Sequence, residues 1–367
     1  MINMACINLT DDEIQAAVNV LQSGALVMGK ENAAFEEAYA AKTGAAHAVS
    51  SSSGTAALML AYMTFLEPGD EVIVPAWTFI ATASTVAFCG GTPVFCDVDP
   101  ESFLIDLDYA ETLITNRTRA IAPVHLFGNA CDVDAIEAFA AKHNLRIVWD
   151  AAQAHGTTIN GRDVGSIGEF VTYSFYPSKT MFVGEGGMTC TSSEDLAAAM
   201  RSKRAHGQSR KYYHDDLGLN LRLTDVEAAI GNCQLKRLDD IIAARRTNAA
   251  VLDAGLLDLP GLKRQRVTDG CEHAWHQYCI TIDADEFGMT RDALKDAMGE
   301  AGIATGIHYP RGLHRQPVFV DRFGTTDLPV CDHLAETILA IPVHQGLTSS
   351  DLNTIVESVQ SNCSAAV

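Results

Sequence analysis

The chain has little positive charge. In its 367 residues, 26 Lys and Arg stand against 46 Asp and Glu, which gives a formal net charge of −20, and the basic residues form no cluster. Binding to nucleic acid or to an anionic membrane surface needs clustered Lys and Arg. We therefore expect neither a nucleic-acid partner nor a membrane partner. A local site for a small anion remains compatible with this composition.

Long apolar runs and paired cysteines are also missing. No stretch approaches the roughly 20 apolar residues of a transmembrane helix. The opening segment "MINMACINLTDDEIQAAV" lacks the basic segment and apolar run of a signal peptide. The ten cysteines are scattered with no C-x-x-C pair, which argues against a zinc site or a disulfide framework. We expect a cytoplasmic protein without a metal.

The chain does contain alternating strand and helix signals from about residue 10 to residue 245. Helical patterns such as 55–66, 132–144 and 193–206 separate short apolar segments at 47–50, 71–76, 92–98, 120–128, 146–150, 170–175 and 186–192. This alternation predicts an α/β fold with a mainly parallel sheet that helices cover on both faces. In such sheets, ligands bind beyond the C-terminal ends of the strands.

The pattern changes near residue 245, and the length of the chain favours two domains. Residues 224–259 predict one long helix between two lobes. After Pro260, a strand at 276–283 and helices at 290–302 and from about 349 predict a smaller α+β lobe. We therefore divide the chain into a large domain, 1–245, which includes the N-terminal segment, and a small C-terminal domain, 246–367.

The segment "VSSSSGTAALMLAY", residues 49–62, places serines, Gly54 and Thr55 between a strand and a helix. The first backbone N–H groups of a helix have no partner within the helix, and its dipole favours an anion there. The turn is therefore suited to a phosphate group. Ordinary N-capping by serine explains this segment equally well.

Two further segments contain Asp150 and Lys179. Asp150 ends the apolar strand of "LRIVWDAAQAHG", with Gln153 three residues later, and Lys179 lies between two strand segments, five residues after Ser174. A buried carboxylate needs a cationic partner. The two residues could form a buried ion pair. Alternatively, Asp150 holds a protonated ring nitrogen, and desolvation keeps Lys179 nucleophilic for Schiff-base chemistry.

Trp77 and Phe79 follow a strand in "IVPAWTFIATAS", where an aromatic side chain could stack on a flat ring or could simply belong to the core. Each motif is ambiguous alone. Together, the phosphate turn, the carboxylate, the aromatic ring and the lysine are the groups that hold pyridoxal 5'-phosphate.

At this point the motifs resemble a known family. The segments "SSSGTAAL", "PAWTFIATA", "DAAQAHG", "SFYPSKTMFVGEGG", "LGLNLRLTDVEAAIGNCQLKRLD" and "GIHYPRGLHRQP" are similar, in order and spacing, to the DegT/DnrJ/EryC1/StrS sugar aminotransferases. The resemblance extends from about residue 7 to residue 360. It implies fold type I of the pyridoxal-phosphate enzymes and a homodimer with two shared active sites.

The resemblance also implies roles for individual residues. Lys179 would carry the cofactor as a Schiff base and move protons, and Asp150 would keep the ring nitrogen protonated. Gln153 would lie beside the ring hydroxyl, and Phe79 matches the stacking aromatic better than Trp77 does. The remaining matches are Gly54, Thr55 and Ser174 for the phosphate, Asn220 for the phosphate from the partner subunit, and His308 and Tyr309 near the sugar nucleotide.

The resemblance implies a ping-pong transfer of an amino group from L-glutamate to a nucleotide-diphosphate ketosugar. The stretch "YYHD" favours C4 of a GDP- or UDP-linked 4-keto-6-deoxyhexose, as in perosamine synthases. The diphosphate would need cationic groups, for which the candidates are Lys30, Arg222, His308 and Arg311. Three alternatives remain open: a C3 aminotransferase, a sugar dehydratase that uses the same cofactor, and a non-catalytic regulator that binds it.

Overall fold

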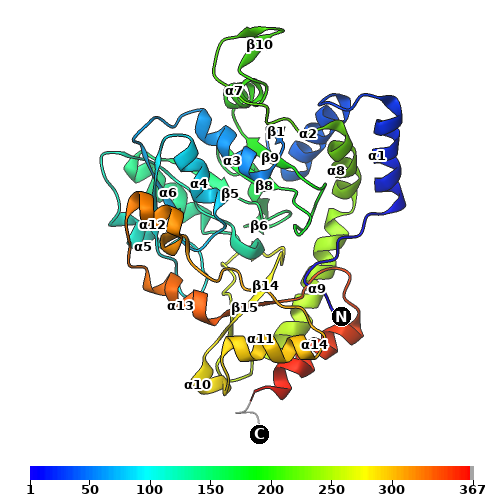
Figure 1. Cartoon of the computed structure of the whole chain (residues 1–367), viewed down its shortest axis with the longest axis vertical. Coiled ribbons are helices and arrows are strands. Elements are labelled where there is room, and N and C mark those ends of the chain that lie inside the picture. The colour runs from blue at the N-terminus through cyan, green and yellow to red at the C-terminus, as the bar shows by residue number, and fades with distance from the viewer. Residues whose placement is uncertain (364–367) are drawn as a thin grey trace.

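The computed structural model describes residues 1–363, so the last four residues of the predicted C-terminal domain lie outside it. The larger lobe is built on a seven-stranded sheet (Figure 1). In spatial order its strands are β1 (His47–Ser51), β9 (Gly187–Thr191), β8 (Phe170–Ser174), β5 (Arg146–Asp150), β4 (Thr118–Ile121), β2 (Glu71–Pro75) and β3 (Thr92–Cys96).

The sheet is mixed and mostly parallel. Strand β9 pairs antiparallel with both β1 and β8, and the other neighbours pair in parallel. Every residue of β2, β8 and β9 is buried, which requires cover on both faces of the sheet because successive side chains point to opposite faces. The predicted α/β class with a mainly parallel sheet is confirmed.

Helices pack around this sheet, and their lengths agree with the helical patterns of their sequences. Thr10 caps the first of them and forms a capping box with Glu13. The helices of this lobe are α1 (Asp11–Ser23), α2 (Lys30–Thr43), α3 (Gly54–Met63), α4 (Ala81–Phe88), α5 (Leu107–Glu111), α6 (Val133–His143), α7 (Glu194–Arg204) and α8 (Asp225–Lys236).

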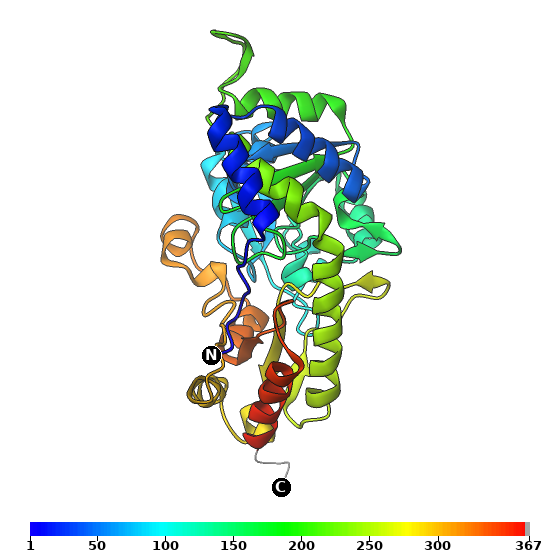
Figure 2. The ribbon, with the colours of Figure 1, turned by 90° about the vertical axis from the view of Figure 1, so that its right-hand side faces the viewer.

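The prediction of one long helix over 224–259 is wrong, because this segment forms two helices. Helix α8 ends at Lys236, and α9 (Leu238–Leu256) begins after Arg237, whose backbone leaves the helical region at φ −108° and ψ 4°. The Arg237 guanidinium contacts the buried Glu13 of α1 at 3.1 Å. Helix α9 alone extends from the larger lobe into the smaller one (Figure 2).

The smaller lobe contains a three-stranded antiparallel sheet in the order β12 (Leu262–Arg264), β14 (Tyr278–Ile282) and β15 (Ile338–Ile341). Ile2 pairs with Ile303 of this lobe, so the N-terminal segment lies against the smaller lobe (Figure 1). The division at residue 245 stays a prediction. The other helices are α10 (Ala284–Phe287), α11 (Arg291–Glu300), α12 (Pro317–Phe323), α13 (Pro329–Thr337) and α14 (Ser349–Ser361).

Two small sheets complete the fold. Strand β6 (Thr158–Ile159) pairs with β7 (Arg162–Asp163) and β13 (Cys271–Glu272). Strands β10 (Gln208–Arg210) and β11 (Tyr213–His214) form a hairpin that projects from the larger lobe beyond α7 (Figure 1). Among residues 1–363, no helix is both long and apolar enough to cross a membrane.

Candidate active site

A cavity of about 650 Å³ opens where β1, β2, β5 and β8 end, and residues of the smaller lobe close its other side. This is the edge of the sheet at which α/β proteins bind ligands. The cavity collects most of the residues that the sequence analysis selected. Its lining includes Gly54, Thr55, Phe79, Asp150, Gln153, Ser174, Lys179, His308 and Tyr309.

Lys179 and Asp150 both face this cavity, and they make no direct ion pair within the described chain. Desolvation lowers the pKa of the Lys179 ammonium to about 8, although the charge of Asp150 opposes that shift. At pH 7, about one tenth of an amine with this pKa is uncharged and can act as a nucleophile. Because both residues line the same cavity, a ligand bound there can contact both.

Asp150 is held in place by two hydrogen bonds from its own chain. Thr82 Oγ1 donates to Asp150 Oδ2 at 2.7 Å, and the backbone N–H of Ala152 donates to Oδ1 at 3.0 Å. Burial raises the pKa of the Asp150 carboxyl, and these two bonds together with the Lys179 charge oppose the rise. Such a carboxylate fits a protonated ring nitrogen, because that nitrogen would supply the cationic partner that burial demands.

The phosphate turn has the geometry of an anion site. Ser53 caps α3 by accepting a hydrogen bond from the backbone N–H of Ala56 at 3.1 Å, and Thr55 is exposed to the cavity. A Cβ atom at Gly54 would lie 2.6 Å from Ser174 Cβ, so only glycine allows β8 and the start of α3 to approach this closely. The residues present therefore fit a phosphate group.

The two aromatic candidates differ in exposure, and the difference decides between them. Trp77 is fully buried and contacts Tyr309 edge-on at 6.0 Å between ring centroids. Phe79 is 56% exposed and lines the cavity. Phe79 can therefore stack on a ligand, and Trp77 belongs to the core.

Gln153 already has partners within the chain. Its Oε1 accepts a hydrogen bond from the backbone N–H of Phe127 at 2.8 Å, and its Nε2 donates to the hydroxyl of Tyr309 at 3.2 Å. These bonds fix the amide plane at the cavity wall. Gln153 also joins the end of β5 to the segment of Tyr309 in the smaller lobe.

Histidines line the side of the cavity that belongs to the smaller lobe. Burial lowers the pKa of His308 to about 4, and its Nδ1 atom is buried without a partner among the described residues. His276 is also in the lining, has an equally unpaired Nδ1, and has its pKa lowered by burial. Sequence reasoning missed His276 because the pattern around it predicts an ordinary strand.

Asn220 and Arg222 are absent from the lining of this cavity within the single chain. Asn220 is exposed and pairs with Ala205 at the end of α7. The carbonyl oxygen of Leu221 accepts a hydrogen bond from the backbone N–H of Ser52 at 2.8 Å, so this segment passes beside the serine turn. The functions expected for Asn220 and Arg222 stay predictions.

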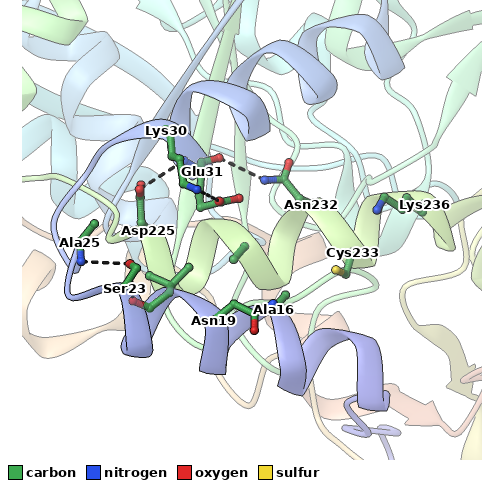
Figure 3. Close-up of a pocket in the computed structure, with 12 residues that line it drawn as sticks. Ala16, Asn19, Ser23, Ala25, Lys30, Glu31, Asp225, Asn232, Cys233 and Lys236 are labelled. Atoms are coloured by element: carbon green, nitrogen blue, oxygen red, sulfur yellow. Dashed lines mark hydrogen bonds and ion pairs between the residues drawn. The ribbon is translucent and has the colours of Figure 1, made fainter.

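Lys30 lines a different cavity, of about 250 Å³, between α1, α8 and the start of α2 (Figure 3). The Asp225 carboxylate there accepts hydrogen bonds from the backbone N–H groups of Gly29, Glu31 and Asn32 and so caps α2. Arg311 is exposed and is likewise outside the lining of the 650 Å³ cavity. Within one chain, neither Lys30 nor Arg311 lines the cavity that contains Lys179.

Comparison with known proteins decides the family. The DegT/DnrJ/EryC1/StrS aminotransferase family matches residues 8–360. The chain belongs to this family. It is a sugar aminotransferase, as its resemblance to the family predicts, and its fold is fold type I.

Three relatives illustrate the match. A UDP-N-acetyl-3-dehydro-alpha-D-glucosamine 3-aminotransferase of Acidithiobacillus ferrooxidans is 39% identical over 354 residues, 96% of this chain and 94% of that protein. A GDP-perosamine synthase of Caulobacter vibrioides is 38% identical over 89% of this chain and 88% of that protein. The structure of S. venezuelae DesV in complex with a ketimine intermediate superimposes with a TM-score of 0.92 at 34% identity, over 96% of this chain and 94% of that one.

Proposed function

We propose that the chain binds pyridoxal 5'-phosphate and transfers an amino group from L-glutamate to the ketone of a nucleotide-linked sugar. The observation that carries this proposal is the amine of Lys179, with a pKa lowered to about 8, in the same cavity as Asp150 and the Gly54 turn. A buried ion pair alone would need neither the phosphate turn nor a cavity lined by both charged groups.

In this proposal, the residues on each side of the cavity have a defined role. The cofactor, when bound, supplies an electron sink and a carrier for the amino group. The backbone N–H groups at Gly54 and Thr55, with the Ser174 hydroxyl, bind its phosphate. Asp150 keeps a proton on its ring nitrogen, and Phe79 covers one face of the ring. Lys179 Nζ would hold the cofactor and, in each half-reaction, would move a proton between a carbon of the bound substrate and a carbon of the cofactor.

The relatives favour a nucleotide-linked ketosugar as the amino acceptor. The two curated relatives described above act at different positions, since one is named a 3-aminotransferase and the other a perosamine synthase, and they are almost equally similar to this chain. We propose amination at C4 of a GDP- or UDP-linked 4-keto-6-deoxyhexose. Amination at C3 is the second candidate, because the 3-aminotransferase relative supports it.

The cavity of one chain lacks the cations that these anionic substrates need. Lys179 is the single Lys or Arg among its lining residues in the described chain, and Glu185 adds a negative charge. We therefore propose a homodimer in which a second copy completes the site and brings Asn220 and Arg222 to it. The projecting hairpin supports this arrangement, because Tyr212 is 81% exposed there and Leu217, just beyond it, is 86% exposed.

The test is an absorbance titration of the cofactor-loaded protein. Adding L-glutamate without sugar should bleach the visible band of the bound cofactor and release 2-oxoglutarate, and a ketosugar nucleotide should then restore the band. Analysis of the sugar product by NMR separates C4 from C3. Loss of water from the sugar without amination would support the dehydratase, and binding without turnover would support the regulator.

A further inference from the structure

A line of hydroxyl groups connects the cavity with the carboxylate of Asp150. Thr78 lines the cavity, and its Oγ1 lies 3.0 Å from Thr82 Oγ1. Thr82 Oγ1 in turn lies 2.7 Å from Asp150 Oδ2. All three side chains are buried, with exposed fractions of 3%, 0% and 5%.

The direction of these hydrogen bonds follows from counting protons. A threonine hydroxyl carries one proton, and an ionised carboxylate carries none. The proton of Thr82 therefore points to Asp150, and the Thr82 oxygen is free to accept the proton of Thr78. The 3.2 Å contact from Thr82 Oγ1 to the carbonyl of Phe79 competes for the same proton, and it is longer and involves an uncharged acceptor.

Asp150 depends on this donor because few other groups stabilise its charge. The titratable groups that act on it electrostatically are Lys179, Tyr62 and Tyr309, and burial raises the pKa of both tyrosines, which keeps them uncharged. Lys179 loses its own charge as the pH rises through its pKa of about 8. The constant stabilisation comes from the Thr82 hydroxyl and the Ala152 N–H.

We propose that Thr82 is a positioning residue that keeps the Asp150 carboxylate ionised and turned toward the ring nitrogen of the cofactor. The inference rests on the proposed function, since it assumes that this cavity binds pyridoxal 5'-phosphate. Thr82 has no place in the lining of the cavity and acts through Asp150.

Helix α4 supplies a matched control one turn later. Thr85 is as buried as Thr82, with an exposed fraction of 0% for each, and its hydroxyl donates to the carbonyl of Ala81 within the same helix at 2.8 Å. Thr82→Val and Thr85→Val therefore exchange the same groups in the same helix. Only the first removes a hydrogen bond to Asp150.

The experiment measures the dissociation constant of pyridoxal 5'-phosphate by absorbance for wild type, T82V and T85V, at about pH 6 and about pH 8. A hydrogen bond to a charged group is worth enough to change binding about 10-fold or more. We expect T82V to weaken binding by that factor relative to T85V at the lower pH. The deficit should shrink at the higher pH, where Asp150 is ionised even without the donor.

A second pair of variants tests the same role of Thr82 if T82V fails to fold. T82S and T82A both remove the methyl group, and only T82S keeps the hydroxyl. We expect T82S to bind within about 2-fold of wild type and T82A to show the pH-dependent loss.

The outcomes distinguish failure of the proposed function from failure of the role proposed for Thr82. If wild type does not bind pyridoxal 5'-phosphate, the proposed function fails. If wild type binds and T82V equals T85V, or if the deficit of T82V and T82A is the same at both pH values, the role of Thr82 is overturned while the proposed function stands.

Discussion

His155 Nε2 donates a hydrogen bond to the backbone carbonyl of Ser174 at 2.8 Å, because a carbonyl oxygen can only accept. The other ring nitrogen, Nδ1, must then accept from the hydroxyl of Tyr39, 2.9 Å away. The ring is neutral, since burial lowers the pKa of His155 to about 4. His155 thus links α2 to Ser174 at the end of β8, the residue against which Gly54 of the phosphate turn packs.

Replacing His155 with Phe should destabilise the fold. The variant leaves the Ser174 carbonyl and the Tyr39 hydroxyl buried without partners, and each unsatisfied group costs about 1–3 kcal/mol. We expect the free energy of unfolding to fall by about 2–5 kcal/mol in a urea titration. The control is His143→Ala, which removes a partly exposed contact to Glu111 at the surface and should change stability little. A loss no greater than that of the control would contradict this prediction.

Buried histidines should make the protein less stable in mild acid. Burial lowers the pKa of His125 to about 3 and that of His155 to about 4, whereas the unfolded chain titrates near 6.5. Below about pH 6.5 the unfolded state therefore binds more protons. Each histidine removes about 2 kcal/mol of stability by about pH 5. In His125→Phe, the unfolding free energy should decrease less between about pH 6.5 and 5 than it does in wild type. An equal decrease in both proteins would contradict the prediction.

Lys179 should react as an unusually acidic amine in the cofactor-free protein. Its pKa of about 8 predicts that labelling by an amine-reactive reagent, followed by peptide mass spectrometry, rises to half its maximum near that pH. Asp150→Asn should move the midpoint lower, because the Asp150 charge raises the pKa of Lys179. A midpoint near the ordinary value of lysine, or an upward shift in the variant, would refute the assignment.

Gly54→Ala should weaken cofactor binding and stability together. The added Cβ would lie 2.6 Å from Ser174 Cβ, and overpacking of this kind costs about 1–3 kcal/mol. Gly299→Ala is the control, because open space surrounds Gly299 in α11 and alanine should stabilise a helix by about 0.5–1 kcal/mol. Thermal melting and a cofactor titration test both variants. If both variants show the same melting temperature and the same cofactor affinity, the steric argument is wrong.

The proposed dimer predicts complementation between two inactive variants. Lys179→Ala removes the amine from its own cavity, and Asn220→Ala removes a group that we propose acts on the partner's cavity. Co-expressed, the two chains can form a mixed dimer in which one site carries neither substitution. We expect that dimer to recover transaminase activity, at most half of the wild-type level per dimer. No recovery in purified mixed dimers would place Asn220 in its own site or outside any site.

The sequence alone determined the features that local chemistry specifies. The strands predicted at 146–150 and 170–175 are β5 and β8, although β8 ends one residue earlier, at Ser174. Their apolar pattern involves only neighbouring residues and can therefore be read from the sequence. The capping box of Thr10 and Glu13 is equally local, since it joins residues three apart. Lys179 was selected because a lysine between two strand segments is unusual, and Gly54 because it lies between a strand and the start of a helix, where an anion can bind.

Only the tertiary structure decided which distant side chains meet. Thr82 is 68 residues from Asp150 in the sequence, and nothing in its own segment indicates that contact. Arg237, at the break between α8 and α9, contacts Glu13 of α1, which is far away in the sequence. His276 enters the cavity only because the smaller lobe closes over the sheet. Periodicity encodes which face of an element is buried, whereas packing of the whole chain fixes what that face contacts.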